Sequence, residues 1–310
     1  MIPAALAHGG ADSPNDEWDG CQRAVDAALE ILAQDGTAVD AAVAATLILE
    51  DDPRFNAGTG SRVRLDGITV QMDAAIMGSD GRFGGVAAIE RVQHPILVAR
   101  EVLESPHLLV VGDGATTLAR RLGLPDYDPT VPAVQEDCDR IRRALADGTA
   151  GEAWQDYDWR RAWNYDVDLA ALGLDRHSVG GDTVGCTVRD RHGNFAAALS
   201  TGGTATTLRG RVGDSCIFGA GLYAGTHGAL AATGEGERIV EATLALRGHD
   251  DLVRGKSAAQ VVAQAIDNLG PRGAIGLLVM TSSDMAAGTA TTMAWAGREL
   301  GSDHWRGPSR

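Results

Sequence analysis

The sequence predicts an α+β fold in which helices and mostly antiparallel sheets pack in layers. The chain has 310 residues, 44% hydrophobic and 22% charged, which is ordinary globular composition and enough for a large core. Apolar residues recur every three to four positions near the start, and extended apolar runs joined by short turns fill the middle. Strands, helices and strands then follow again. This order, with hairpin-like connections, is typical of layered α+β packing.

Two helices are expected first. Apolar residues in 18–32 share one helical face, and Gly36 is expected to end this helix. Thr37 is a typical N-cap for the second helix because Asp40 follows three residues later, and Pro53 marks its end.

Shorter elements follow as far as residue 122. The Asp66-Gly67 turn between two apolar runs predicts a hairpin, and Pro95 is suited to the first turn of a helix. In order, we expect strands at 62–65, 68–77 and 82–92, a helix at 95–104, a strand at 107–111 and a helix at 115–122.

The segment 125–182 has a different composition, because charged residues, Pro, Trp and Tyr become frequent. We interpret it as a partly helical, weakly packed connector, and a solvated linker is a simpler reading of its tryptophans than a partner surface. Regular patterns then return. We expect strands at 184–189 and 195–200, helices near 237–246 and 258–269, and strands at 275–280 and 292–296.

Charge and cysteine usage exclude several classes of protein. The net charge of −15 argues against nucleic acid or an anionic membrane as a partner. The first residues have no basic region before their short apolar run, and no stretch of about 20 apolar residues exists, so neither a signal peptide nor a membrane span is expected. The four cysteines form no C-x-x-C pair, which predicts reduced thiols and a cytoplasmic protein.

No organic cofactor is expected either. Gly112-Asp113-Gly114 imitates a dinucleotide-binding turn, but Thr117 stands where the third glycine would be. The eight histidines show no metal-ligand spacing, and Ser200 is not inside a G-x-S-x-G nucleophile elbow.

The most informative stretch is GGDTVGCTV around Thr183. A threonine hydroxyl is a weak nucleophile unless a base lies within hydrogen-bond reach. If the peptide bond before Thr183 is cut, the new α-amine, with a reference pKa of about 7.7–8.0, can be that base. Taken alone, however, Asp-Thr-Val-Gly is more often the mere beginning of a β-strand.

Several further motifs occur in a fixed order around Thr183. They are HGGA at 8–11, FNAGTGS at 55–61, MDAAIM at 72–77, GDTVG at 181–185, STGG at 200–203, GRVGDS at 210–215, GAGLYA at 219–224 and ATGEGE at 232–237. With these motifs the chain resembles the plant-type asparaginase, isoaspartyl peptidase and glycosylasparaginase family over most of its length. One departure is Asp12, where many members of the family have glycine.

The resemblance implies a four-layer αββα sandwich of the N-terminal-nucleophile (Ntn) hydrolase type, with two antiparallel sheets. It implies one domain, 1–310, cleaved into 1–182, which ends in the connector 125–182, and 183–310. The assembly implied is a homodimer of such cleaved αβ pairs.

The resemblance also implies the catalytic residues. Thr183 is the nucleophile, released by cleavage after Asp182. Thr201 is a second threonine that hydrogen-bonds the nucleophile. Thr233, through its hydroxyl, and Gly234, through its backbone N–H, form the oxyanion hole.

The substrate-binding residues follow from the same resemblance. Arg211 holds a substrate α-carboxylate and Asp214 the α-ammonium, as a guanidinium fork and a carboxylate are suited to do. Gly236 lies beside the same pocket and Asn56 near the scissile bond. The loop from Leu49 to Ser61 holds a structural sodium ion through backbone carbonyls. Read alone, Arg211 and Asp214 could instead be a local salt bridge in a turn.

The expected activity is therefore an autoprocessing threonine amidohydrolase acting on L-asparagine, β-aspartyl dipeptides or both. The alternatives are a glycosylasparaginase acting on N-glycosyl-asparagine and a catalytically silent binding protein of the same fold.

Overall fold

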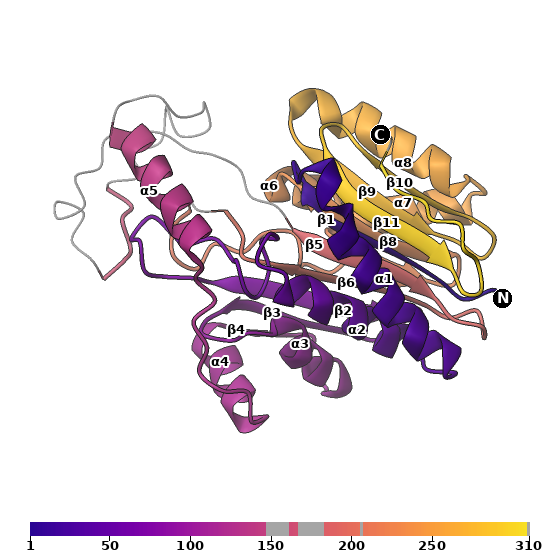
Figure 1. Cartoon of the computed structure of the whole chain (residues 1–310), viewed down its shortest axis with the longest axis horizontal. Helices are drawn as coiled ribbons and strands as arrows, with labels where there is room; N and C mark the ends of the chain where they lie inside the picture. The colour runs from indigo at the N-terminus through magenta and orange to yellow at the C-terminus, as the bar shows by residue number, and fades with distance from the viewer. Residues whose placement is uncertain (147–160, 167–182, 205–206, 309–310) are drawn as a thin grey trace.

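The computed structural model describes residues 1–146, 161–166, 183–204 and 207–308. Two sheets pack face to face, and helices cover the outer face of each (Figure 1). The expected four-layer α+β sandwich is thus confirmed. None of the helices in these described ranges is long and apolar enough to cross a membrane.

The larger sheet has seven strands in the order β11-β1-β5-β6-β2-β3-β4. All neighbouring pairs are antiparallel except β3 and β4, which are parallel. This corrects the expectation of a purely antiparallel sheet, and the reason is that a helix connects β3 to β4 as a crossover. The strands are β1 (Ala4–Ala11), β2 (Met72–Gly78), β3 (Phe83–Ile89), β4 (Leu109–Val111), β5 (Val184–Arg189), β6 (Phe195–Thr201) and β11 (Met293–Glu299).

The smaller sheet has four antiparallel strands in the order β10-β9-β8-β7. Its inner face packs against the larger sheet, where β5 and β6 contact β8 and β7. The strands are β7 (Leu222–Gly225), β8 (Gly228–Gly234), β9 (Ile275–Met280) and β10 (Met285–Thr289).

The outer layers are helical. On the larger sheet lie α1 (Trp18–Ala33), α2 (Ala38–Asp51), α3 (Pro95–Glu104) and α4 (Gly112–Arg121). On the smaller sheet lie α7 (Leu244–Val253) and α8 (Ala258–Leu269), with the short α6 (Gly236–Ala242) directly after β8. Helix α5 (Pro132–Ala146) belongs to the connector and lies to one side of the layers in Figure 1. Its Val134, Cys138 and Ile141 are nevertheless buried, so the prediction of a weakly packed connector is wrong for this helix.

The junction between α1 and α2 shows how local sequence sets these helices. After α1 ends at Ala33, the residue in the left-handed conformation is Asp35, at φ 64°, and not Gly36. Gly36 is still needed, because a Cβ there would lie 2.4 Å from Ile31 Cγ2. Thr37 caps α2 as expected, its Oγ1 accepting the Asp40 backbone N–H at 3.1 Å.

Two sets of strand predictions were wrong. No strand forms at 62–65; the Asp66-Gly67 turn is present, but the strand after it begins only at β2. Strands β1, β7, β8 and β10 were not predicted at all. Their sequences are rich in Ala and Gly, which have low intrinsic strand propensity, so burial between layers rather than local preference makes them extended.

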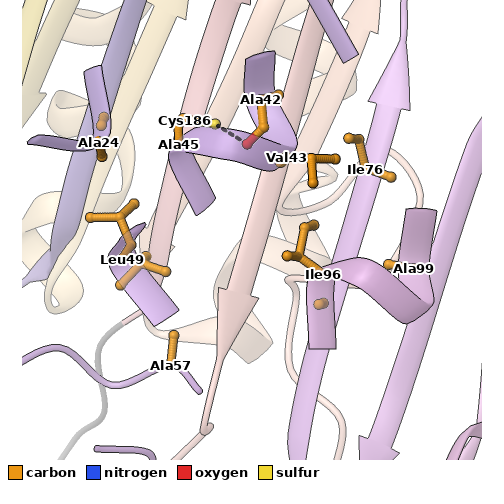
Figure 2. Close-up of a cluster of buried hydrophobic side chains, with 14 of the residues drawn as sticks. Ala24, Ala42, Val43, Ala45, Leu49, Ala57, Ile76, Ile96, Ala99 and Cys186 are labelled. Carbon is orange, nitrogen blue, oxygen red and sulfur yellow. Dashed lines mark hydrogen bonds between the residues drawn. The ribbon is translucent and has the colours of Figure 1, made fainter. Parts of the chain in front are cut away.

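Small side chains also fill the core under the first helices. Ala42, Ala45 and Leu49 of α2 face the larger sheet, and Cys186 Sγ of β5 lies 3.4 Å from the carbonyl oxygen of Ala42 (Figure 2). Close packing of this kind leaves little freedom for relative movement. Strand β5, which begins one residue after Thr183, is therefore held firmly by the helix behind it.

Candidate active site

Thr183 lies at the start of β5, in the middle of the larger sheet and facing the smaller one. Only 4% of its surface is exposed. Asp182, the other residue of the predicted cleavage bond, lies outside the described residues. A buried position gives a weak nucleophile fixed partners in place of bulk water.

The backbone N–H of Thr183 donates to Thr233 Oγ1 at 3.3 Å, and its side-chain Oγ1 lies 3.5 Å from Ser215 Oγ. Ser215 was not singled out from the sequence. The register that pairs Val184 with Ser200 continues to place Thr183 opposite Thr201.

No direct hydrogen bond joins Thr201 to Thr183 among the described residues, and the expected contact between them stays a prediction for the cleaved chain. Thr201 is buried at the end of β6, and its Oγ1 accepts the backbone N–H of Gly203 at 2.9 Å. The hydroxyl is used to shape the turn after the strand, although the two threonines are cross-strand neighbours.

Thr233 and Gly234 lie at the end of β8, across the interface between the sheets. Thr233 Oγ1 accepts the N–H of Ala11 at 3.0 Å as well as that of Thr183. A hydroxyl that accepts two hydrogen bonds still has its own proton to donate, as an oxyanion hole requires. Gly234 has φ 132°, and a Cβ there would lie 2.2 Å from the Ala274 carbonyl oxygen, so only glycine fits.

Arg211 is largely buried, with 17% of its side chain exposed, and is paired with Glu237 at the start of α6. Its Nε and Nη2 donate to the two carboxylate oxygens at 2.9 Å and 2.7 Å. Sequence reasoning missed Glu237. Arg211 makes no hydrogen bond to Asp214 within the described part of the chain, so the alternative of a local Arg211–Asp214 turn bridge is not supported.

Asp214 is a buried carboxylate with an unsatisfied oxygen. Its Oδ2 has no hydrogen-bond partner among the described residues. Added Cβ atoms on Gly221 and Gly236 would lie 2.6 Å from Oδ2 and 3.0 Å from Oδ1, and the latter also 2.9 Å from Arg211 Nη2. Burial raises the pKa of Asp214 to about 7, against the opposing effects of a backbone hydrogen bond and Arg211. Glycine at 236 thus leaves space where both charged groups face, and a cation there would stabilise the carboxylate.

Asn56 connects the loop after α2 to the turn after Thr201. Its Nδ2 donates to the Gly203 carbonyl at 2.8 Å, and its Oδ1 accepts the Arg62 N–H at 2.9 Å. Its own carbonyl oxygen accepts the Gly202 N–H at 2.9 Å. Asn56 therefore positions the backbone around Thr201, and its predicted place near the scissile bond stays a prediction.

The predicted sodium loop, Leu49 to Ser61, folds its backbone oxygens inward. An added Cβ on Gly58 would lie 2.5 Å from the Glu50 carbonyl oxygen, and one on Gly60 2.6 Å from that of Pro53 and 2.8 Å from that of Phe55. Hard cations take oxygen ligands of this kind, so the loop fits the ion chemically. Side chains do not offer an alternative site: the described residues contain no group of three His, Cys, Asp or Glu placed to hold a metal.

The HGGA motif lies in β1, the strand beside Thr183 in the larger sheet. His8 is fully buried in β1 and paired in register with Gly185. Burial lowers the pKa of His8 to about 3, and an interaction with the backbone of Thr183 opposes this only partly. The imidazole is therefore neutral at any pH near neutrality. Gly9 has no room for a side chain, because a Cβ would lie 2.3 Å from the ring of Phe55.

Comparison with known proteins agrees with this geometry. A sequence profile described as asparaginase matches residues 2–303. The chain belongs to the asparaginase family. It is similar to the human isoaspartyl peptidase/L-asparaginase, with 34% identity covering 98% of this chain and 96% of the human protein. It is also similar to a plant-type L-asparaginase from Pyrococcus furiosus, with 37% identity covering 84% of this chain and 83% of that protein.

Within this asparaginase fold, the predicted site residues come from both sheets and meet at the interface between them. Thr183 and Thr201 come from the larger sheet, and Thr233 and Gly234 from the smaller. The two residues that were missed, Ser215 and Glu237, each end a motif already recognised, GRVGDS and ATGEGE. Because these polar residues directly follow Asp214 and Gly236 in the sequence, their position could have indicated that they belong to the site.

Proposed function

We propose that this asparaginase-family chain is an autoprocessing threonine amidohydrolase acting on L-asparagine and β-aspartyl dipeptides. The observation that carries the proposal is buried Thr183 with its nitrogen against the Thr233 hydroxyl, close to a buried carboxylate and guanidinium that can read an amino acid. The names of the human and Pyrococcus relatives support the same substrate class.

Autocleavage would begin with attack of Thr183 Oγ1 on the carbonyl carbon of Asp182. The C–N bond breaks, the nitrogen of Thr183 takes a proton, and the residue is left joined to Asp182 through an ester. Water then hydrolyses the ester, giving chains 1–182 and 183–310. Only hydroxyl, amide and water take part, so no cofactor is required.

In turnover the free α-amine of Thr183 would act as the base for its own hydroxyl. The hydroxyl attacks the side-chain carbonyl of the substrate, and negative charge develops on that oxygen. The Thr233 O–H and the Gly234 N–H stabilise this charge. Ammonia or a peptide amine leaves with a proton, and water releases L-aspartate from the aspartyl ester.

Substrate recognition would use charges that the fold already holds in place. Arg211, positioned by Glu237, presents a guanidinium to the α-carboxylate. Asp214, whose Oδ2 has no hydrogen-bond partner among the described residues, accepts the α-ammonium. The space beside Gly236 lets one ligand reach both groups.

Three further features belong to the proposal. The inward carbonyls of the loop from Leu49 to Ser61 support a structural sodium ion. All four cysteines are free thiols, which supports the cytoplasm as the location. A homodimer of cleaved αβ pairs is proposed as the assembly, with neither nucleic acid nor membrane as a partner given the net charge of −15.

A denaturing gel and a substrate panel test the proposal. Purified protein should give two bands that sum to 32.2 kDa, and the smaller fragment should begin Thr-Val-Gly-Cys on Edman sequencing. The mature protein should then release ammonia from L-asparagine and aspartate from β-aspartyl dipeptides. An uncut protein that is inactive on the whole panel would support the silent binding protein, and activity confined to N-glycosyl-asparagine the glycosylasparaginase.

A further inference from the structure

A cavity of about 400 Å³ is lined by residues of α6, α7 and α8, the helices associated with the smaller sheet. It is distinct from the site around Thr183, which lies between the two sheets. Its lining includes the buried apolar side chains of Leu244, Val261 and Leu269 beside several charged ones. Its volume is within the range of small-molecule sites, which combine apolar walls with a few polar groups.

Three arginines from three different elements line this cavity: Arg238 of α6, Arg247 of α7 and Arg272 after α8. Arg238 is already used, because its Nε lies 2.6 Å from Glu235 Oε2. Arg247 and Arg272 make no ion pair or side-chain hydrogen bond within the described part of the chain.

Two carboxylates line the cavity as well. Asp251 is paired with Lys256 at 3.0 Å and with Arg254 at 3.4 Å, neither of which lines the cavity. Glu241 makes no such pair with any described residue. Two exposed cations, Arg247 and Arg272, and one exposed anion, Glu241, therefore line the cavity without an ion pair to any described residue.

This set of charges is the complement of a molecule with two carboxylates and one ammonium group. Guanidinium forks bind carboxylates in a bidentate manner, and a carboxylate accepts hydrogen bonds from an ammonium. We propose that the cavity is a second binding site, for an α-amino dicarboxylate of the L-aspartate type. Arg247 and Arg272 bind its two carboxylates and Glu241 its ammonium.

The backbone beside the cavity is strained, which is a second and independent observation. Thr243 joins α6 to α7 with φ 48° and ψ 48°, the left-handed region. A β-branched residue rarely adopts this conformation, and such outliers cluster at functional sites. The strained joint sets the angle between two of the helices that line the cavity.

Helix α6 connects the cavity to the active site. It begins at Gly236, beside Asp214, and continues with Glu237, which holds Arg211. The next residue, Arg238, and Glu241 one turn later line the cavity. The choice of L-aspartate as ligand rests on the proposed function, of which it is the acid product, so the second site would sense accumulated product through α6.

Equilibrium binding of radiolabelled L-aspartate to the full-length protein tests the proposal. Wild type should bind two molecules per chain, one in each site. Arg211→Ala should leave the cavity site alone, and the double change Arg247→Ala/Arg272→Ala should leave the active site alone. The triple variant should bind none. Arg121→Ala changes an exposed arginine of α4, in the opposite helical layer, that makes no ion pair or side-chain hydrogen bond with the described residues; it is the matched control and should keep both sites.

A second comparison tests the role of Glu241. On the Arg211→Ala background, Glu241→Gln should weaken L-aspartate binding by at least about tenfold, as expected for loss of a charge-assisted contact. Succinate, which lacks the ammonium group, should bind equally well to both proteins. Circular dichroism confirms that each variant is folded.

The proposal would be overturned if Arg211→Ala still bound L-aspartate after Arg247 and Arg272 were also replaced by alanine. It would equally be overturned if Arg211→Ala alone bound no L-aspartate. A double variant that changes only the oligomeric state on light scattering would overturn it as well, because a second copy of the chain would then cover the cavity. None of these readouts uses turnover. Failure of the second site therefore stays separate from failure of the proposed hydrolase activity, which is measured by ammonia release.

Discussion

The backbone nitrogen of Thr183 lies 3.3 Å from Thr233 Oγ1, although the two residues are 50 positions apart and belong to different sheets. In the uncut chain this nitrogen is an amide that donates to the hydroxyl. After cleavage the same atom would be the α-amine proposed as the base. If the chain is cleaved as proposed, Thr233 would contact the same nitrogen before and after cleavage.

Replacing Thr233 with valine should impair both stability and catalysis. Valine keeps the shape but leaves the N–H groups of Ala11 and Thr183 without an acceptor, and a buried unsatisfied donor costs about 1–3 kcal/mol. Loss of one oxyanion donor typically lowers kcat by about 10²–10³-fold. Urea unfolding and ammonia release measure the two effects. Thr233→Ser keeps the hydroxyl and should retain most of both; a valine variant with unchanged kcat would remove Thr233 from the oxyanion hole.

Thr183→Ala should give an intact, folded and inactive chain. Among the described residues the hydroxyl has only a long contact, 3.5 Å to Ser215 Oγ, so its removal should change the free energy of unfolding by less than about 1 kcal/mol. A denaturing gel should show one band of 32.2 kDa, with no ammonia released. Thr183→Ser is the matched control and should still be cleaved. Cleavage of the alanine variant would point to another nucleophile, with Ser215 and Thr201 the first to test.

Much of the fold could be predicted from the sequence because many helices and turns are determined by neighbouring residues. The Thr37 cap, bonded to Asp40 three residues later, is set by neighbouring residues alone. The parallel pairing of β3 with β4 is not local, since it depends on the path of the chain through α3. Strands rich in alanine and glycine, such as β8, have low intrinsic strand propensity, so packing between the sheets is what makes them extended.

The candidate site could be predicted from the sequence only where its residues belong to recognised family motifs. Thr183, Thr233 and Asp214 were predicted through a family resemblance, and the structure places Thr183 against Thr233 and against Ser215, which follows Asp214 in the chain. Ser215 and Glu237 were missed because their roles depend on partners 32 and 26 positions away in the chain. No residue periodicity encodes such contacts. They become visible only when the two sheets are packed.

The turn after HGGA offers a test of backbone strain beside the site. Asp12 has φ 72°, and its N–H donates to the Thr292 carbonyl at 2.8 Å. Aspartate tolerates this left-handed conformation better than β-branched residues. Asp12→Val should therefore lower the free energy of unfolding by about 1–2 kcal/mol, while Asp12→Gly should change it by less than about 1 kcal/mol. Equal effects of the two changes on the urea midpoint would show that the turn is not strained.

His8→Ala should leave the acid limb of the pH–rate profile in place. Burial lowers the pKa of His8 to about 3, so the imidazole stays neutral across the working range and cannot titrate near neutrality. The α-amine of Thr183, with a reference pKa of about 7.7–8.0, can. The measurement is kcat/KM for L-asparagine from pH 5 to 9. Disappearance of the limb, with normal cleavage and fold, would make His8 the base.

Asp214 is a further source of pH dependence, because burial raises its pKa to about 7 in the ligand-free site. Below that pH it is protonated and a poor partner for an α-ammonium, which gives kcat/KM an acid limb of its own. Succinamate, which is L-asparagine without the amino group, separates the two sources. Its profile should keep the limb of the Thr183 amine and lose that of Asp214. Identical profiles for both substrates would show that Asp214 does not contact the ammonium.

The same raised pKa predicts how stability depends on pH. The unfolded carboxyl ionises near its model value of 3.8, whereas the folded one keeps its proton up to about 7. Between these values the folded state binds more protons than the unfolded state, so the Asp214 contribution to stability falls as pH rises. Asp214→Asn cannot ionise and lacks this loss. Urea unfolding of both proteins at pH 4.5, 5.5, 6.5 and 7.5 should therefore show the variant gaining stability relative to wild type at each step. A difference that stays constant over this range would mean that Asp214 ionises normally, and that other charges in the site already compensate it when no substrate is bound.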